Sequence, residues 1–250
     1  MSFKLYSKYY DLLYSDKNYS AESDYVVQIL EKFSNVKIQK LLELGGGSGN
    51  HAFYFSEFFN KICGVELSLT MVDIALARDI PNYEVKHGDI CSNHYPNEQF
   101  DCVVSLFHVI SYLDTNEQII NCFNSVNEQL KTGGIFLFDV WYTPAVYHLK
   151  PETRVKKMED HEIIVTRIAQ SNSDYENSIV DVNYSIFIED LKNNNYEVIN
   201  ETHKMRHFTS NEIRLYAEIC GFDLIASEEL LTKKEPSNET WGVMFVLKKK

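Results

Sequence analysis

The sequence predicts an α/β fold built on a doubly wound, mostly parallel sheet of seven strands. Short apolar segments with strand character alternate with helical segments between residues 38 and 141, a pattern typical of parallel sheets covered by helices on both faces. A glycine-rich loop joins the first strand to the helix that follows it. After residue 150 the pattern changes to longer alternating stretches, which predict an antiparallel β insertion before the last helix.

The order of the elements divides the chain into three parts. Residues 1–36 are predicted to form a helical lid, because clustered tyrosines precede a helical segment over residues 21–33. Residues 37–150 and 209–250 are predicted to form the core, and 151–208 the insertion that covers the substrate site. The predicted core strands are 40–44, 61–66, 83–87, 100–106, 135–141, 222–231 and 240–247. The predicted core helices are 50–59, 70–78, 117–130 and 211–220, with a turn at Gly133 and Gly134 and with Thr209 capping the last helix.

The composition is that of an acidic globular protein. The formal net charge is −12 at pH 7, so the surface lacks the basic character that nucleic acids and anionic membranes attract, and we expect neither as a partner. The longest apolar runs, such as residues 135–140, are far shorter than the roughly 20 residues that cross a bilayer. We therefore expect a cytoplasmic protein, with a homodimer left open as its oligomeric state.

The five cysteines are expected to be buried thiols. Cys63 and Cys102 lie inside apolar strand segments, where a small thiol packs well. No two cysteines have the C-x-x-C spacing that marks zinc and redox sites, so no metal site is predicted.

Residues 41–50 (LLELGGGSGN) lead from a buried strand through consecutive glycines into a helix. Glycine accepts a positive φ and has no Cβ to obstruct a ligand, so this bend at the carboxyl end of the first strand is typical of a nucleotide-like cofactor site. The dinucleotide pattern G-x-G-x-x-G fails, because Asn50 stands where the third glycine belongs. The pattern is instead an acidic residue followed by glycines at alternate positions, namely Glu43, Gly45, Gly47 and Gly49.

Two further carboxylates follow the next two strands. Glu66 ends the apolar second strand at about the distance expected for a carboxylate that binds the ribose hydroxyls of a nucleotide. Enzymes that use NAD share this feature, so Glu66 by itself leaves the cofactor open. Asp89 follows the third strand within the sequence His87-Gly88-Asp89-Ile90.

This set of motifs resembles the class I methyltransferases, which have a Rossmann-like fold and use S-adenosyl-L-methionine. The resemblance implies that Glu43 helps to hold the ammonium group of the methionine part, while the three glycines of the loop give that part room. It also implies that Asp89 accepts a hydrogen bond from the adenine amine. Leu67, Ile90 and Leu106 are assigned to the cofactor site on the same basis.

In that family the loop after the fourth strand faces the methyl group, and here it contains residues 105–113 (SLFHVISYL). His108 and Tyr112 are the predicted acid–base or acceptor-orienting groups, and Phe107 is predicted to contact the acceptor. His108 and Tyr112 could instead pack against the loop or cap it. The loop lacks the Asn-Pro-Pro-Tyr motif of enzymes that methylate flipped-out adenine, so DNA is not an expected substrate.

Several segments resemble the N,N-dimethyltransferases of nucleotide-linked deoxyamino sugars, the desosamine and mycaminose enzymes. They are residues 10–12 (YDL), 17–19 (KNY), 139–144 (DVWYTP) and 203–209 (HKMRHFT). The resemblance implies a small-molecule acceptor, the amino group of a nucleotide sugar, and makes Tyr10 and Tyr19 residues of a lid over the cofactor. The sequence departs from these enzymes at Tyr112, where they more often have histidine.

A diphosphate on the substrate would explain why basic residues lie in the insertion of an otherwise acidic chain. Arg154 and Arg206 are predicted to bind it, and Trp141 and Tyr142 are predicted to stack on the base or the sugar. Exposed strand charges and core aromatics are the alternative interpretations of these residues. Three alternatives stay open for the whole protein: a methyltransferase for another N- or O-acceptor, an NAD-binding oxidoreductase, and a cofactor-binding regulator without catalysis.

Overall fold

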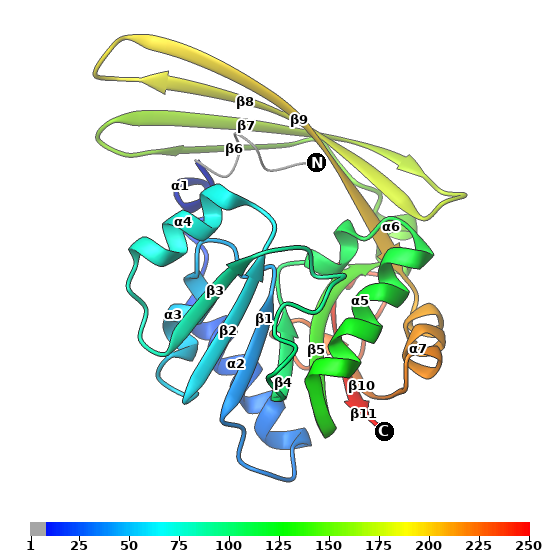
Figure 1. Cartoon of the computed structure of the whole chain (residues 1–250). Coiled ribbons are helices and arrows are strands. Elements are labelled where there is room, and N and C mark those ends of the chain that lie inside the picture. Colours follow the sequence, from blue (N-terminus) through cyan, green and yellow to red (C-terminus); the bar gives the residue numbers. More distant parts are fainter. Residues whose placement is uncertain (1–8) are drawn as a thin grey trace.

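The structure, a computed structural model, describes residues 9–250 and places a twisted sheet between two layers of helices (Figure 1). The parallel strands lie in the order β3-β2-β1-β4-β5, and the antiparallel strand β11 follows β5, with β10 at the far edge. The bounds of these strands are β1 (Lys40–Leu44), β2 (Lys61–Glu66), β3 (Tyr83–His87), β4 (Phe100–Ser105), β5 (Leu130–Tyr142), β10 (Phe222–Glu229) and β11 (Gly242–Lys249).

Side chains of the sheet alternate between two apolar layers, because successive residues of a strand point to opposite faces. Leu41 and Cys102 pack with the first layer of helices, whereas Leu42 and Val103 pack with the second. The first layer contains α2 (Tyr19–Phe33) and α3 (Asn50–Phe55), and the second contains α5 (Asn116–Gln129) and α7 (Ser210–Ile219). The remaining helices are α1 (Tyr10–Leu13), α4 (Leu69–Ala77), the 3-10 helix η2 (Val109–Tyr112) and α6 (Thr143–Leu149).

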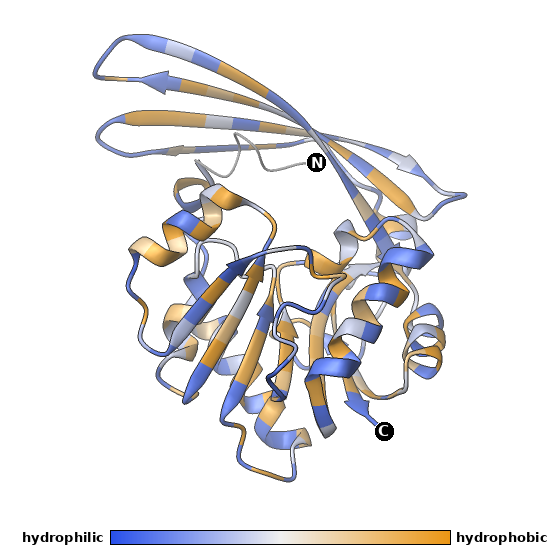
Figure 2. Cartoon of the chain, viewed as in Figure 1, coloured by the Kyte–Doolittle hydropathy of each residue, from blue (hydrophilic) through white to orange (hydrophobic). Residues whose placement is uncertain are grey.

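The predicted insertion is an antiparallel sheet that lies over α1 and the adjoining edge of the core (Figure 1). Its strands are β6 (Arg154–Glu159), β7 (Ile163–Asp174), β8 (Ile179–Asp190) and β9 (Asn195–Phe208). Hydrophilic and apolar residues alternate along them (Figure 2), and Val165, Ile186 and Ile199 pack with Leu13 of α1. The end of β9 pairs with the end of β5, so the insertion continues the core sheet. Within residues 9–250 the sheet therefore has 11 strands, which are the seven predicted for the core and the four of the insertion.

The structure corrects several predicted boundaries. Gly133 and Gly134 do not form a turn before the fifth strand but lie inside β5, where the register with β4 shifts between Phe100 and Cys102. The helix predicted at residues 50–59 ends at Phe55 as α3, and the short helix α6 was not predicted. The capping prediction is confirmed, because Thr209 and Glu212 form a capping box at the start of α7.

Residues 1–8, which belong to the predicted lid, lie outside the described residues, and the division into lid, core and cover stays a prediction. Within residues 9–250, no helix has both the length and the apolar character required to span a membrane.

Candidate active site

The glycine loop bends sharply above the end of β1. The Gly45 N–H donates a hydrogen bond to the Val65 carbonyl at 2.8 Å, which ties the loop to β2. Gly45 has φ +70°, and a Cβ at this position would lie 2.6 Å from the side chain of Val109. Gly47 has φ +56°, and nothing lies within 4 Å of the place where its Cβ would be. The loop therefore keeps its backbone open toward the space above it at Gly47.

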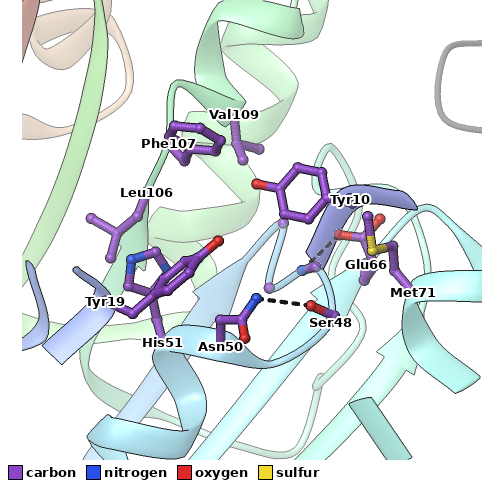
Figure 3. Close-up of a pocket in the computed structure, with 13 residues that line it drawn as sticks. Tyr10, Tyr19, Ser48, Asn50, His51, Glu66, Met71, Leu106, Phe107 and Val109 are labelled. Carbon is purple, nitrogen blue, oxygen red and sulfur yellow. Dashed lines mark hydrogen bonds between the residues drawn. The ribbon is translucent and has the colours of Figure 1, made fainter. Parts of the chain in front are cut away.

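That space is a pocket that opens above the glycine loop (Figure 3). Its walls come from the N-terminal tyrosines, the glycine loop, the end of β2 and the loop after β4. The lining residues are Tyr10, Tyr19, Gly45, Gly46, Gly47, Ser48, Asn50, His51, Glu66, Met71, Leu106, Phe107 and Val109. The structure thus brings together seven of the predicted site residues, namely Tyr10, Tyr19, Gly45, Gly47, Glu66, Leu106 and Phe107.

Glu66 is held in place by the backbone on both sides. Its Oε2 accepts a hydrogen bond from the Gly47 N–H at 3.0 Å, and its Oε1 accepts one from the Ser68 N–H at 2.7 Å. Burial raises the pKa of Glu66 above its ordinary value, although these backbone donors act in the opposite direction. Each carboxylate oxygen has a second lone pair, so the group can still accept hydrogen bonds from two vicinal hydroxyls.

Glu43 is 2% exposed at the end of β1, and within the described part of the chain its Oε2 has no hydrogen-bond partner. Burial, followed by the charge of Glu66, raises the pKa of Glu43 to about 8. Its Oε1 lies 3.9 Å from His51 Nδ1, and His51 Nε2 lies 2.7 Å from Glu22 Oε2. A buried oxygen without a partner costs free energy, which a cationic ligand group would recover.

His108 lies beside the pocket and pairs with Asp139 at the carboxyl end of β5. Its Nδ1 is 2.6 Å from Asp139 Oδ2, and its backbone N–H donates to the same oxygen at 3.1 Å. Burial raises the pKa of the fully buried Asp139, but His108 outweighs this effect, so the pKa lies below its ordinary value. Phe107 and His108 have φ values of +66° and +62°. Two successive non-glycine residues in this conformation are strained, a feature that is concentrated at functional sites.

The other residues predicted to contact the methyl acceptor differ in how close they lie to the His108–Asp139 pair. The Trp141 ring meets the His108 ring edge to face at 6.3 Å between centroids. Tyr112 points instead to the insertion, where its hydroxyl lies 2.9 Å from His203 Nδ1. The Tyr142 hydroxyl lies 3.4 Å from Ser210 Oγ, at the start of α7. The structure therefore places Trp141 next to His108, and places Tyr112 and Tyr142 in other contacts.

Besides Glu43, His108, Tyr112, Trp141 and Tyr142, six further predicted site residues do not line the pocket. The Asp89 side chain is exposed and caps its own turn by accepting a hydrogen bond from the Cys91 N–H at 2.9 Å. Leu67 is 43% exposed, and Ile90 is packed in the core. Arg154 is exposed at the start of the outermost strand β6, whereas Arg206 is buried and donates to the Tyr216 hydroxyl at 3.1 Å. Gly49, a sixth such residue, caps α3. The roles assigned to these residues stay predictions.

The structure brings to the site several residues that were not predicted from the sequence. They are Ser48, Asn50, His51, Met71 and Val109 of the pocket, together with Asp139, Glu22 and Lys17 around it. Asp139 carried a signal, since it is a carboxylate near the end of an apolar strand, where parallel strands place functional groups.

Comparisons with known proteins identify the core. A family model described as a methyltransferase domain matches residues 41–134. The dTDP-3-amino-3,4,6-trideoxy-alpha-D-glucopyranose N,N-dimethyltransferase of Streptomyces venezuelae is 29% identical over 140 residues, which are 55% of this chain and 58% of that enzyme. The matched segment therefore spans little more than half the length of that relative.

Two solved structures share the fold over nearly the whole chain. The sugar N-methyltransferase KedS8 from Streptoalloteichus sp ATCC 53650 has a TM-score of 0.82 and 20% identity, with coverage of 99% of this chain and 93% of that chain. The SAM-bound amino pentose methyltransferase CalS10 from Micromonospora echinaspora has a TM-score of 0.77 and 18% identity, with coverage of 100% and 98%. These likenesses establish the fold, including the insertion.

The residues present fit S-adenosylmethionine. Gly47 leaves open space above the loop, Glu66 offers acceptors for ribose hydroxyls, and Glu43 has a buried oxygen suited to the ammonium group. The domain match and the missing third glycine set aside the interpretation as an NAD-binding oxidoreductase. A methyltransferase domain therefore matches residues 41–134, and the residues around its glycine loop fit S-adenosylmethionine.

Proposed function

We propose that the methyl acceptor is the amino group of a nucleotide-linked deoxyamino sugar. The observation that carries this proposal is the His108–Asp139 pair beside the cofactor pocket, because an amine must lose a proton when it is methylated. The His108 ring stacks on Phe107, which lines the pocket, with 5.9 Å between ring centroids. The pair therefore lies within reach of a group that approaches the pocket from the Phe107 side.

The chemistry divides between cofactor and protein. When bound, S-adenosylmethionine supplies the methyl group for an in-line displacement, in which the nitrogen–carbon bond forms as the sulfur–carbon bond breaks. Asp139 holds Nδ1 of His108, so Nε2 is the ring nitrogen that takes up the proton of the amine. Tyr10, Tyr14 and Phe107 pack against one another over the pocket and keep bulk water from the reacting atoms.

A cationic wall above this region supports a nucleotide-linked substrate. Arg167 of β7 donates a hydrogen bond to the Tyr14 hydroxyl at 2.8 Å, and the Tyr14 ring meets Phe107 edge to face at 4.9 Å. Lys156 of β6 lies over the same tyrosine ring, 5.2 Å from its centroid. These two cations lie beside Tyr14, whereas the predicted Arg154 is exposed and the predicted Arg206 contacts Tyr216 of α7. An arginine and a lysine suit the diphosphate of a nucleotide sugar.

The relatives support the same class of acceptor. The Streptomyces venezuelae relative is named for a dTDP-linked amino sugar, and the two solved structures are named as sugar or amino pentose methyltransferases. The acceptor of this chain is proposed from these names together with the geometry of His108 and Arg167.

The test is a methylation assay with paired acceptors. Purified protein and S-adenosylmethionine are incubated with a dTDP-linked aminodeoxy sugar, with the same dTDP-sugar carrying a hydroxyl in place of the amine, and with phosphoethanolamine as an amine without a sugar. Mass spectrometry reads the addition of one or two methyl groups. We expect transfer to the amino sugar alone.

Transfer only to the hydroxyl sugar or only to the small amine would overturn the proposal in favour of another N- or O-acceptor. No transfer to any acceptor, with S-adenosylhomocysteine still bound, would favour a cofactor-binding regulator.

A further inference from the structure

Lys17 lies between α1 and α2 and places its ammonium group behind one wall of the cofactor pocket. The side chain is 13% exposed, and Nζ lies 2.7 Å from Glu22 Oε2. The ammonium also lies over two aromatic rings, 3.9 Å from the centroid of Phe107 and 4.6 Å from that of Tyr19. Both rings line the cofactor pocket, so a buried positive charge is in direct contact with the pocket wall.

A second, smaller cavity lies next to the cofactor pocket and is lined in part by this lysine. The two cavities share Leu106 and Phe107 as walls, and Lys17 lines the second with Glu22 and Asp139. Only side chains separate the ammonium group from the cofactor pocket. A lysine has a flexible stem of four carbons, so small rotations suffice to bring its charge to the pocket.

The two ends of the cofactor pocket differ in chemistry (Figure 3). Glu66 and Met71 lie at one end, and the Glu66 carboxylate suits the ribose hydroxyls. Tyr19, His51 and Leu106 lie at the other end. Because the sulfur and the amino acid follow the ribose in S-adenosylmethionine, a cofactor with its ribose at Glu66 would extend its amino acid toward the end where Lys17 contacts Tyr19.

The charges at this end are suited to an amino acid. Glu22, Glu43 and Asp139 provide negative charge or buried oxygen for an α-ammonium group. Burial lowers the pKa of His51, so this ring is neutral near pH 7. Among the described residues that line the two cavities, Lys17 is the only lysine or arginine. Arg78, which is nearby in the fold, lines neither cavity and pairs with Asp11 at 2.7 Å.

We propose that Lys17 binds the α-carboxylate of S-adenosylmethionine. A carboxylate in a partly buried pocket requires a cation or strong donors, and an ammonium group forms charge-assisted hydrogen bonds with it. The ammonium has three N–H donors, so it can pair with Glu22 and with the ligand carboxylate together. The rings of Phe107 and Tyr19 limit where the ammonium can lie and hold it near that end of the pocket.

The test compares two ligands that differ in the amino acid. S-adenosylhomocysteine contains the carboxylate, whereas 5′-methylthioadenosine has the adenosyl and sulfur parts without it. Isothermal titration calorimetry measures both dissociation constants for the parent protein and for Lys17→Met. We expect the substitution to weaken S-adenosylhomocysteine binding by about 10-fold to 100-fold, the range for a lost hydrogen bond to a charged group, and to change methylthioadenosine binding by less than about 3-fold.

Three further variants accompany this comparison. Lys61→Met removes an ion-paired lysine that lines neither cavity and should leave both affinities unchanged. Glu66→Gln should weaken both ligands, because both contain the ribose. Lys17→Arg keeps the charge and should restore part of the lost affinity for S-adenosylhomocysteine.

Equal losses for both ligands in Lys17→Met would overturn the proposal, because the lysine would then only support the shape of the pocket. Unchanged affinity for S-adenosylhomocysteine would overturn it as well. If the variant fails to fold, the salt dependence of binding to the parent protein tests the proposal. The affinity for S-adenosylhomocysteine should then fall relative to that for methylthioadenosine as the salt concentration increases. None of these measurements uses an acceptor, so their outcome is independent of the proposed amino-sugar substrate.

Discussion

Glu43 illustrates how a single residue can be prepared for a ligand at the expense of stability. Its carboxyl group is completely surrounded by protein at the end of β1, and one oxygen lacks a partner among the described residues. The sequence showed an acidic residue before the glycines, but only the structure shows that the group is dry and close to a second carboxylate, Glu66. Its protonation state is therefore coupled both to folding and to cofactor binding.

Replacing Glu43 by glutamine should stabilise the protein without ligand, and increasingly so at higher pH. The pKa rises from an ordinary value of 4.5 to about 8, so between these values the folded state holds a proton that the unfolded state has lost. The free energy of unfolding of the parent therefore falls as pH rises through this window, by up to about 1.4 kcal/mol per pH unit, and that of Glu43→Gln does not.

Thermal or urea unfolding at pH 5, 6, 7 and 8 measures this difference. A constant gap between the two proteins would show that Glu43 does not hold a proton in the folded state. Calorimetry in buffers of different ionisation enthalpy gives a second readout at pH 7: binding of S-adenosylhomocysteine should release a proton from the parent and not from the variant.

In the proposed reaction Asp139 positions His108, so its substitution by asparagine should lower kcat without weakening cofactor binding. The amide cannot stabilise a protonated imidazole, so we expect kcat to fall by about 100-fold or more, while the affinity for S-adenosylhomocysteine stays within about 3-fold. The pH profile of kcat should change as well. Asp101→Asn is the matched control at the opposite end of the sheet, where Asp101 Oδ2 accepts from the Gln39 and Lys40 N–H groups; it should lower Tm and leave kcat unchanged.

At the level of elements, the loop between β1 and α3 combines a structural and a functional constraint. Gly45 and Gly47 both have positive φ, so any side chain is strained at either position. They differ in surroundings, because Gly45 faces Val109 of η2 whereas Gly47 faces the open pocket. The same residue type in the same loop therefore has two different reasons to be present.

Alanine at these two positions should separate stability from binding. Gly45→Ala forces a Cβ against Val109 and adds overpacking to backbone strain, so we expect a loss of roughly 2–4 kcal/mol in the free energy of unfolding. Gly47→Ala has only the strain, about 1 kcal/mol, but places a methyl group where the cofactor lies, and S-adenosylhomocysteine binding should fall by 10-fold or more. Urea denaturation and calorimetry measure the two quantities. Equal stability losses would contradict the prediction.

At the scale of the whole molecule, the insertion contacts the N-terminal segment beside the site, although the two segments are far apart in the sequence. The hydrogen bond from Arg167 to Tyr14 and the ion pair of Lys156 with Asp16 tie the sheet of β6–β9 to the N-terminal segment. Through Tyr14 and Phe107, these contacts continue to the wall of the cofactor pocket. The insertion, the N-terminal segment and the cofactor pocket therefore meet at one place.

Arg167→Met should raise the KM for a diphosphate-containing acceptor by about 10-fold or more, because it removes a cation from the wall beside Tyr14. The Kd for S-adenosylhomocysteine should change little. Arg154→Met is the matched control, since this exposed arginine on β6 lies outside the pocket, and it should leave KM unchanged. Steady-state kinetics with the acceptor found in the paired assay gives both values; a larger effect of Arg154→Met would place the diphosphate at the outer edge of the sheet instead.

The sequence by itself determined the order of the strands and helices of the core, the place of the glycine loop and the place of Glu66 at the end of the second strand. These features are local, because apolar periodicity, glycine conformation and the end of a strand are encoded within a few residues. Parallel strands also bring their carboxyl ends to one edge, so the loop and Glu66 had to be neighbours. The tertiary structure decided which other side chains reach that edge. It brings Asp139 to His108 and Lys17 to Phe107, and leaves Asp89 and Arg206 outside, because such contacts depend on how distant segments dock, which no local pattern records.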